Sequence, residues 1–304
     1  MENGTAVSVA GVTKRFDTVT AVDNLSLRIK EGSVYGLLGP NGAGKTTTLR
    51  MILRITIPDS GSIHMLGRPQ DDSTQDLIGY LPEERGLYPR MKVREVLLFL
   101  AGLKGISDSE SQRRVREWLE RLEIASWADR KVIDLSKGMQ QKVQFIAAVI
   151  HRPPVLILDE PFSGLDPVNA TVIKDIMLEL RQKGATIILS THRIEQVEMM
   201  CDAICLINKG RSVLEGELAA IKRSYGKNTV RIEYEGDGEF LNRPDFVQSV
   251  NHFGAVTEAK LAPGADPQEL LKAAVTRGIR VNHFELVEPP LNDIFIEKVS
   301  EAYA

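Results

Sequence analysis

Short apolar runs alternate with longer amphipathic stretches through the first two thirds of the chain. A run that is apolar throughout and short enough for a strand indicates a strand buried on both faces. Strands of this kind, separated by helices, predict an α/β domain in which a parallel sheet is covered on both faces. The clearest runs are Ser33–Gly39, Pro154–Glu160, Ala185–Thr191 and Ala203–Gly210.

The stretch from Met91 to Asp134 has a different pattern, because its apolar residues recur at intervals of three and four. This spacing places them on one face of a helix. We therefore expect a helical insertion, at about residues 91–134, that interrupts the sheet domain and packs through this face. The residues are Val93, Val96, Leu97, Leu100, Leu103, Val115, Trp118, Leu119 and Leu122.

A smaller second domain is expected after the polar, glycine-containing stretch Ile221–Asn228. We place the boundary between residues 222 and 223, so that the sheet domain covers 1–222 and a small α+β accessory domain covers 223–304. Alternation predicts strands at 229–235 and 279–287, and helical patterns lie at 266–278 and 290–300. His252 and His283 are isolated in this domain, so we expect no catalytic constellation there.

The segment Gly39–Thr46, GPNGAGKT, has the spacing of a phosphate-binding loop and lies between a predicted strand and a predicted helix. Its glycines let backbone N–H groups approach phosphate oxygens, and the helix N-terminus adds partial positive charge. Lys45 would then reach the β- and γ-phosphates, and the Thr46 hydroxyl would bind Mg²⁺. The alternative is a glycine-rich turn before an ordinary helix.

A nucleotide-bound Mg²⁺ also needs a carboxylate, and the apolar run VLILDE ends in two, Asp159 and Glu160. We expect Asp159 to hold the metal, through water, and Glu160 to polarise the attacking water as a general base. An apolar strand ending in two acids is a weak signal alone, because a strand-end turn has the same pattern. Together with the phosphate loop it indicates a nucleotide site, which a nucleotide kinase or a motor ATPase would also contain.

Composition and charge exclude several other classes. The chain has 304 residues, 43% of them hydrophobic and 26% charged, and a net charge of −3, which argues against a nucleic-acid partner. Its longest apolar run, Val96–Leu103, is far shorter than the ~20 residues that cross a bilayer, and the N-terminus lacks a secretory pattern. Cys201 and Cys205 are expected to be reduced core residues in a cytoplasmic protein.

Further motifs occur in a fixed order: LSKGMQQK from Leu135, LILDEP, SGLDP at Ser163–Pro167, and LSTH ending at His192. This ordered set resembles the motifs of ATP-binding cassette (ABC) ATPases over about residues 7–217. Residues 221–304 are similar to the C-terminal domain of ATPase subunits of bacterial drug and sodium efflux systems. The resemblance implies a P-loop NTPase fold with a helical subdomain, ATP and Mg²⁺ as cofactors, and ATP hydrolysis coupled to transport.

The resemblance also implies a head-to-tail dimer, of this chain or with a paralogous cassette, that closes on ATP. Ser136 and Gly138 of one subunit would face the nucleotide of the other, and Asp166 would lie at the seam. His192 would contact the γ-phosphate, as a catalytic residue with Lys45 and Glu160, and Phe16 would stack on adenine. The expected ATP-binding residues are Phe16, Gly39, Pro40, Asn41, Gly42, Ala43, Gly44, Lys45, Thr46, Thr47, Ser136, Gly138 and Asp166.

Two segments depart from the family pattern. Lys137 and Met139 replace a glycine and a glutamine in the signature motif, which leaves the contacts to the γ-phosphate open. Glu83, in GYLPEERGLY, occupies the place of a glutamine that reaches Mg²⁺ in the family, and we expect it to join Thr46 and Asp159 as a metal ligand.

The residues after Glu83 are expected to face a membrane partner. They are Glu84, Arg85 and Tyr88. The alternative for Glu83 and Glu84 is a mobile loop on which both carboxylates are solvated.

The function expected from the resemblance is an ATP-hydrolysing transporter subunit, with export favoured over import. Integral membrane subunits would dock between the sheet domain and the helical insertion, so the chain would lie at the cytoplasmic face of the cell membrane. The alternative is a soluble cassette ATPase acting on ribosomes or DNA, although the chain has one phosphate loop and no sustained heptads. A nucleotide-gated binding module without turnover is a third hypothesis, which Glu160 disfavours.

Overall fold

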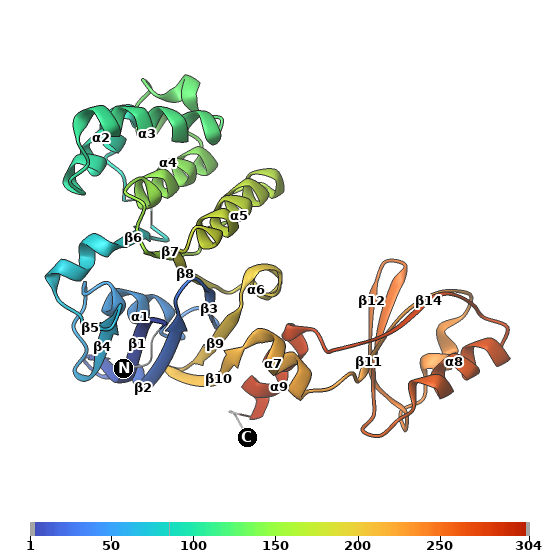
Figure 1. Ribbon diagram of the computed structural model, residues 1–304. Coiled ribbons are helices and arrows are strands. Elements are labelled where there is room, and N and C mark those ends of the chain that lie inside the picture. Colours follow the sequence, from blue (N-terminus) through green and yellow to red (C-terminus); the bar gives the residue numbers. More distant parts are fainter. Residues whose placement is uncertain (1–3, 85, 302–304) are drawn as a thin grey trace. The chain divides into compact units, whose positions relative to one another are not determined.

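The computed structural model of the chain describes residues 4–84 and 86–301, and Arg85 lies outside them. The chain divides into two compact units, Met1–Gly216 and Glu217–Ala304, shown in Figure 1. The boundary expected between residues 222 and 223 falls inside helix α7 (Leu218–Ser224), which the structure assigns to the second unit.

The first unit is built on a six-stranded sheet with the order β10-β9-β3-β8-β7-β6. The four strands expected from apolar runs are neighbours in it, and they pair in parallel, which confirms the predicted parallel sheet. Every residue of β3 and β7 is buried, as their uninterrupted apolar sequences require. The strands are β3 (Val34–Leu38), β6 (Ile78–Leu81), β7 (Val155–Asp159), β8 (Thr186–Thr191), β9 (Ala203–Asn208) and β10 (Arg211–Glu217).

A second sheet, absent from the sequence expectations, has the order β2-β1-β4-β5 and is antiparallel. Its strands are β1 (Thr5–Phe16), β2 (Val19–Lys30), β4 (Ser60–Met65) and β5 (Arg68–Pro69). One apolar core joins residues of this sheet, of helix α1 (Lys45–Ile52) and of the parallel sheet. Helices α5 (Pro167–Gln182) and α6 (Ile194–Met200) contact strands of the parallel sheet.

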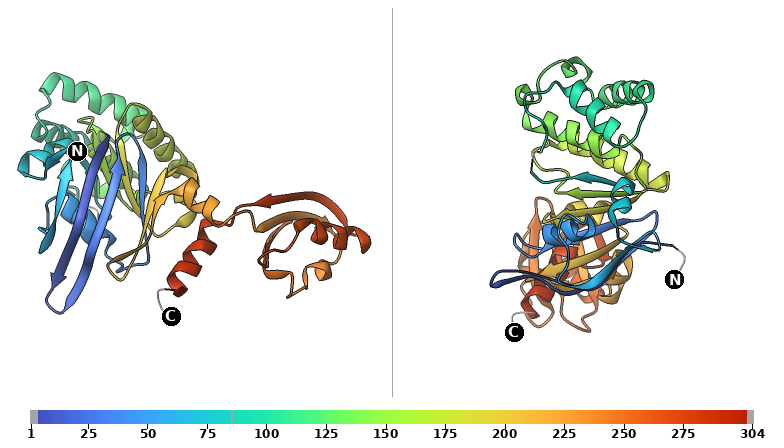
Figure 2. Two further views of the ribbon diagram at one scale, coloured as in Figure 1. Left: turned by 60° about the horizontal axis from the view of Figure 1, so that its bottom comes forward. Right: turned by 90° about the vertical axis from the view of Figure 1, so that its left-hand side faces the viewer.

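The expected helical insertion is confirmed. Helices α2 (Val93–Leu103) and α3 (Asp108–Arg121) lie within the predicted range, with short turns η2 (Ala125–Trp127) and η3 (Val132–Asp134) after them. Helices α2 and α3 pack with α4 (Lys137–Val149). The rings of Trp118 and Phe145 lie edge to face in this contact, with their centroids 6.4 Å apart. These green helices gather at one end of the first unit (Figures 1 and 2). A further turn, η1 (Asp72–Leu77), precedes β6.

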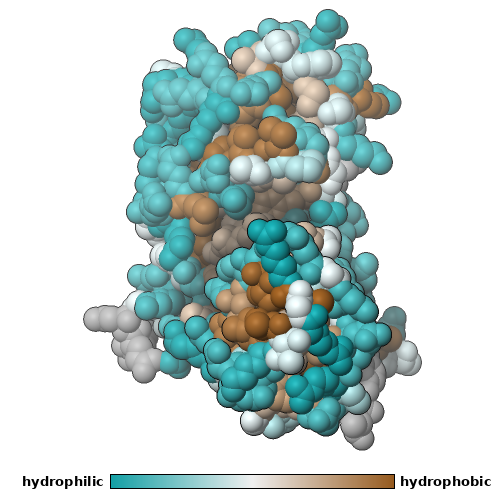
Figure 3. Space-filling view, turned by 90° about the vertical axis from the view of Figure 1, so that its right-hand side faces the viewer, coloured by the Kyte–Doolittle hydropathy of each residue, from teal (hydrophilic) through white to brown (hydrophobic). Residues whose placement is uncertain are grey.

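The second unit is an antiparallel sheet, β12-β13-β11-β14, packed with helices. Its elements are α7, β11 (Thr229–Glu235), η4 (Gly238–Leu241), β12 (Val247–Phe253), β13 (Val256–Leu261), α8 (Pro267–Thr276), β14 (Arg280–Val287) and α9 (Leu291–Glu301). The α+β organisation is as expected, but the sequence pattern did not indicate the β12–β13 hairpin. Helix α8 contacts β14 and η4 over a core that includes Val230, Phe240 and Leu270. Some apolar surface stays visible on this unit in Figure 3.

Among the described residues, no helix is long and apolar enough to cross a membrane. The two cysteines are buried in the first unit as expected, and burial raises the pKa of the Cys205 thiol to about 12. Thiols of this kind are weak nucleophiles, so they act as core residues.

Candidate nucleotide-binding site

The glycine-rich loop connects the buried end of β3 to the start of α1, as the sequence predicts. Gly39 has φ 151°, and a Cβ atom there would lie 2.2 Å from the carbonyl oxygen of Ile207. Gly44, the N-cap of α1, has φ 108°, and its Cβ would lie 2.5 Å from the carbonyl oxygen of Ala21. Only glycine fits at either position. The first turn of α1 contains no acidic residue, so its partial positive charge is available to an anion.

Lys45 is buried at the centre of this site. Its ammonium group donates to the carbonyl oxygens of Gly39 and Pro40, at 2.8 and 3.1 Å. Burial lowers the pKa of Lys45, and the carboxylates of Glu160, Asp159 and Glu83 oppose that effect. The lysine is therefore a positive charge held between the loop and three acidic side chains.

Asp159 ends β7 and is 1% exposed. Its two carboxylate oxygens accept hydrogen bonds from the hydroxyl groups of Thr46, at 3.1 Å, and of Ser190. Glu83 lines the same cavity of about 240 Å³, together with the phosphate loop and Glu160. A hydroxyl and one or two carboxylates suit Mg²⁺, which prefers hard oxygen ligands and keeps several waters, so these residues fit the expected metal.

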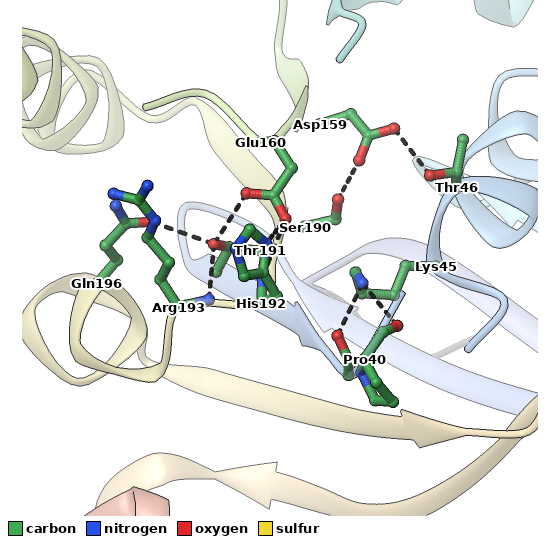
Figure 4. Close-up of polar contacts among 11 residues, drawn as sticks. Pro40, Lys45, Thr46, Asp159, Glu160, Ser190, Thr191, His192, Arg193 and Gln196 are labelled. Carbon is green, nitrogen blue, oxygen red and sulfur yellow. Dashed lines mark hydrogen bonds and ion pairs between the residues drawn. The ribbon is translucent and has the colours of Figure 1, made fainter. Parts of the chain in front are cut away.

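Glu160 has φ 49°, an uncommon conformation for a residue other than glycine, and its backbone N–H donates to the carbonyl oxygen of Ser190 at 3.0 Å. Figure 4 shows its carboxylate facing the turn after β8. There the Thr191 hydroxyl donates to it at 3.2 Å and the His192 N–H at 3.0 Å, while His192 Nδ1 lies 2.6 Å from it. The Glu160 side chain is 12% exposed and lines the cavity of the phosphate loop, whereas the His192 side chain is half exposed.

The structure thus brings together six residues that the sequence predicted: Lys45, Thr46, Glu83, Asp159, Glu160 and His192. Sequence reasoning missed the two hydroxyl groups that hold the carboxylates, those of Ser190 and Thr191. Both lie in LSTH, directly before the predicted histidine, and their polar side chains at the end of an apolar strand were the available signal.

Seven predicted residues do not line the described part of this cavity. Gly39 and Pro40 begin the loop, where their carbonyl oxygens accept hydrogen bonds from Lys45, and His192 contacts Glu160.

The other four are Phe16, Ser136, Gly138 and Asp166. Phe16 is 48% exposed at the end of β1, with the Lys14 ammonium 5.6 Å from its ring centre. Ser136 and Asp166 are the N-caps of α4 and α5, where they accept hydrogen bonds from the backbone N–H groups of Met139 and Asn169. The hydrogen bonds from Asn169 lower the pKa of Asp166.

The fourth residue, Gly138, lies at the start of α4, where a Cβ atom would be 3.3 Å from the carbonyl oxygen of Gly164. The glycine therefore keeps the start of α4 close to the loop that precedes α5. Contacts of these four residues with nucleotide stay predictions.

A separate groove of about 310 Å³ lies between the sheet part and the helical part of the first unit. Its apolar lining comes from both parts, with Leu53 and Ile55 after α1 and Leu100 and Leu103 on α2. Ile55 and Leu103 are more than half exposed. This is the region where sequence reasoning expected a partner to dock.

Comparison with known proteins agrees with this geometry. Residues 22–163 match the family model described as ABC transporter, and residues 216–299 match the C-terminal domain of DrrA1-3-like ATP-binding proteins. The ABC transporter ATP-binding protein YhaQ of Bacillus subtilis (strain 168) is 46% identical over 297 residues, which are 98% of this chain and 99% of that protein. The chain belongs to the ABC transporter ATP-binding proteins. It is a nucleotide-binding ATPase subunit.

Two further ABC proteins are informative. The Nod factor export ATP-binding protein I of Burkholderia pseudomallei (strain 1710b) is 41% identical over 208 residues, 67% of this chain and 68% of that protein. A solved ABC cassette, described as a dimer in a post-hydrolysis state bound to ADP and Pi, superposes with a TM-score of 0.65 at 27% identity. That match covers 70% of this chain and 98% of the cassette. It confirms the predicted ABC ATPase fold for the first unit.

Proposed function

We propose that this ABC subunit hydrolyses Mg²⁺-ATP at the Lys45–Glu160 site and that two cassettes close on the nucleotide during the cycle. One observation supports this most strongly: the Glu160 carboxylate is held by the turn after β8 while it lines the cavity of the phosphate loop. A fixed carboxylate beside a γ-phosphate position is what general-base activation of water needs.

Each residue then has a distinct role. The backbone N–H groups of the loop and the start of α1 bind the phosphates, and Lys45 neutralises the β- and γ-phosphate oxygens. Thr46, Asp159 and Glu83 hold Mg²⁺, which when bound stabilises negative charge on the phosphates. Glu160 takes a proton from the attacking water, and His192 orients that water and contacts the γ-phosphate.

Dimerisation completes the site. Ser136 and Asp166 lie at helix N-termini, and the start of α4 can donate to an anion supplied by a second cassette. Lys45 already serves this chain's own phosphate loop. The ligand of Ser136 and Gly138 is therefore the ATP of the partner, and Phe16 stacks on adenine. The solved relative, which is described as dimeric and bound to ADP and Pi, supports dimerisation.

The transporter to which the subunit belongs is an exporter, with membrane subunits docked in the apolar groove between Ile55 and Leu103, at the cytoplasmic face of the membrane. The relative named as a Nod factor export ATP-binding protein supports that direction. The net charge of −3 disfavours action on nucleic acid.

The test is phosphate release from the purified chain and from Glu160→Gln. The substitution keeps the shape of the side chain but removes the base, so turnover should fall at least about 100-fold while ATP still binds. Glu84→Gln is the matched control, because Glu84 does not line the described cavity, and it should hydrolyse ATP at close to the parental rate. Retention of most activity in Glu160→Gln would remove Glu160 as the base.

A further inference from the structure

Helix α4 carries two buried glutamines, three positions apart, whose side-chain amides bind the backbone next to the site's acidic residues. Gln141 Nε2 donates to the carbonyl oxygen of Pro161 at 3.1 Å, and Pro161 follows Glu160. Gln144 Nε2 donates to the carbonyl oxygen of Glu84 at 3.0 Å, and Glu84 follows Glu83. The two glutamines are 2% and 3% exposed. One helix therefore holds both acidic segments of the nucleotide site.

The segment that carries Glu83 is fixed to α4 at a second point. Gly79 lies in β6, and a Cβ atom there would be 2.1 Å from the carbonyl oxygen of Ala148 on α4. The backbones of β6 and α4 are consequently in direct contact. Between this contact and the hydrogen bond at Glu84 there are only a few residues, so the loop that presents Glu83 has little freedom to move independently of α4.

Glu83 itself points into the nucleotide cavity. It lines that cavity with Lys45 and Asp159, and its carboxylate is one of the three that counter the effect of burial on the pKa of Lys45. A carboxylate that binds a metal needs a fixed distance to the other ligands, and partners behind the ligand commonly set that distance.

We propose that Gln144 is a positioning residue that sets the location of Glu83 at the metal site. The proposal rests on the function proposed above, in which Glu83 is a Mg²⁺ ligand. Because the hydrogen bond reaches the backbone of Glu84, it constrains the loop whatever the Glu84 side chain does. Since Ser136 is the N-cap of α4, a shift of that helix on dimer closure would be passed through Gln144 to Glu83.

The first experiment measures equilibrium binding of ATP to the full chain as a function of Mg²⁺, by titration calorimetry. Gln144→Met keeps an unbranched side chain of similar length but removes the amide donor. The Mg²⁺ concentration at half-maximal enhancement of ATP binding should rise about 10-fold. ATP binding without Mg²⁺ should stay at the parental level, because the phosphate loop is untouched.

A double variant shows whether Gln144 acts through Glu83. Glu83→Gln should itself raise the Mg²⁺ requirement, and adding Gln144→Met in that background should produce no further shift. Additive shifts in the double variant would overturn the proposal, since they would mean that Gln144 affects the site by another route.

Gln140→Met is the matched control on the same helix. The Gln140 amide donates to the carbonyl oxygens of Val132 and Leu135, both at 3.2 Å, and thus holds a turn that carries no site carboxylate. This variant loses comparable hydrogen bonds, and its Mg²⁺ requirement should equal that of the parent. Should Gln144→Met not fold, Gln144→Leu, which also lacks the amide donor and adds no charge, should give the same shift, and a parental Mg²⁺ requirement would contradict the proposal.

The outcomes separate the two claims. If the parent shows neither Mg²⁺-dependent ATP binding nor phosphate release, the proposed function fails. If the parent shows both, and Gln144→Met binds like Gln140→Met, the function stands and the positioning role of Gln144 is refuted.

Discussion

Both units of the chain bury charged side chains, but they use them differently. In the first unit, Lys45 and Asp159 are buried at one end of the parallel sheet and line a common cavity with Glu83 and Glu160. In the second unit, Glu258 is buried on β13 and is paired with Arg231 of the neighbouring strand at 2.8 Å. The charge of Glu258 is neutralised by Arg231, and this ion pair does not line the described part of the nucleotide cavity. A buried charge that is neutralised by one neighbouring ion-pair partner does not indicate a functional site. Several buried charged groups that line one cavity, without such one-to-one pairing, do indicate one.

The largest expected effect separates these two uses of charge. Lys45→Met should lower phosphate release more than about 100-fold, because the developing charge on the γ-phosphate loses its main cation. Arg231→Met breaks the ion pair of the second unit and should leave the turnover of ATP unchanged. Phosphate-release assays on both variants test this, and a similar loss of turnover in Arg231→Met would show that the second unit takes part in catalysis.

A glycine in each unit gives a second comparison, in stability. Gly39→Ala places a Cβ atom 2.2 Å from a backbone oxygen at φ 151° and should cost about 3 kcal/mol in the free energy of unfolding. Gly254→Ala, in the hairpin turn between β12 and β13, meets open space at φ 64° and should cost about 1 kcal/mol.

Denaturant unfolding followed by two signals checks this comparison. The only tryptophans, Trp118 and Trp127, lie in the first unit and report on it, while far-ultraviolet circular dichroism reports on both units. Equal costs for the two substitutions would mean that the loop around Gly39 relaxes.

The smallest expected effect is a pH dependence of the free energy of unfolding, caused by His151 in the apolar groove of the first unit. Burial, with the nearby charge of Lys104 second, lowers the pKa of His151 to about 4 from its usual 6.5, while its Nε2 lies 3.1 Å from the carbonyl oxygen of Ile78. Between these pH values the unfolded chain binds a proton that the folded chain does not. The stabilising effect of the neutral ring is therefore complete above pH 6.5 and is lost as the pH falls towards 4.

The size of this loss should be about 1 kcal/mol, reduced by partial exposure of the ring to solvent. Unfolding followed by tryptophan fluorescence at pH 7 and pH 5 measures it. His151→Gln should remove this part of the pH dependence, and an unchanged pH profile in that variant would show that the ring does not resist protonation.

The sequence predicted the parallel sheet, the helical insertion and four of the site residues, Lys45, Thr46, Asp159 and Glu160, because each belongs to a local pattern. Glu83 and His192 were predicted only through the resemblance to ABC ATPases. The uninterrupted apolar sequence VLILD is one example of such a pattern. The antiparallel sheet of the first unit escaped prediction because register shifts along β1, for example between Val9 and Val12, interrupt the alternation of buried and exposed residues. Strand β12 has only Val247 buried, so its sequence contains almost no periodic signal.

The supporting contacts of the site were beyond sequence reasoning for another reason. Gln144 and Glu84 are sixty positions apart in the sequence. Their hydrogen bond joins a side-chain amide to a backbone oxygen, which every residue type has, so the sequence contains no sign of this pairing. A site role for Thr191 was easier to predict, because this residue directly precedes His192. Its hydrogen bond to Glu160 was not predictable, because Glu160 lies at the end of another strand. Convergence of strand ends in a parallel sheet is predictable, whereas the hydrogen bonds made there depend on exact side-chain placement.

The central claim is that Glu160 is the base of a site completed by two cassettes. The most direct measurement is the mass of Glu160→Gln in solution by light scattering, with Mg²⁺-ATP and without nucleotide. We expect a stable dimer, twice the mass of one chain, with Mg²⁺-ATP only, because ATP binds and is not hydrolysed. A monomer under both conditions, at ATP concentrations that saturate binding, would contradict it.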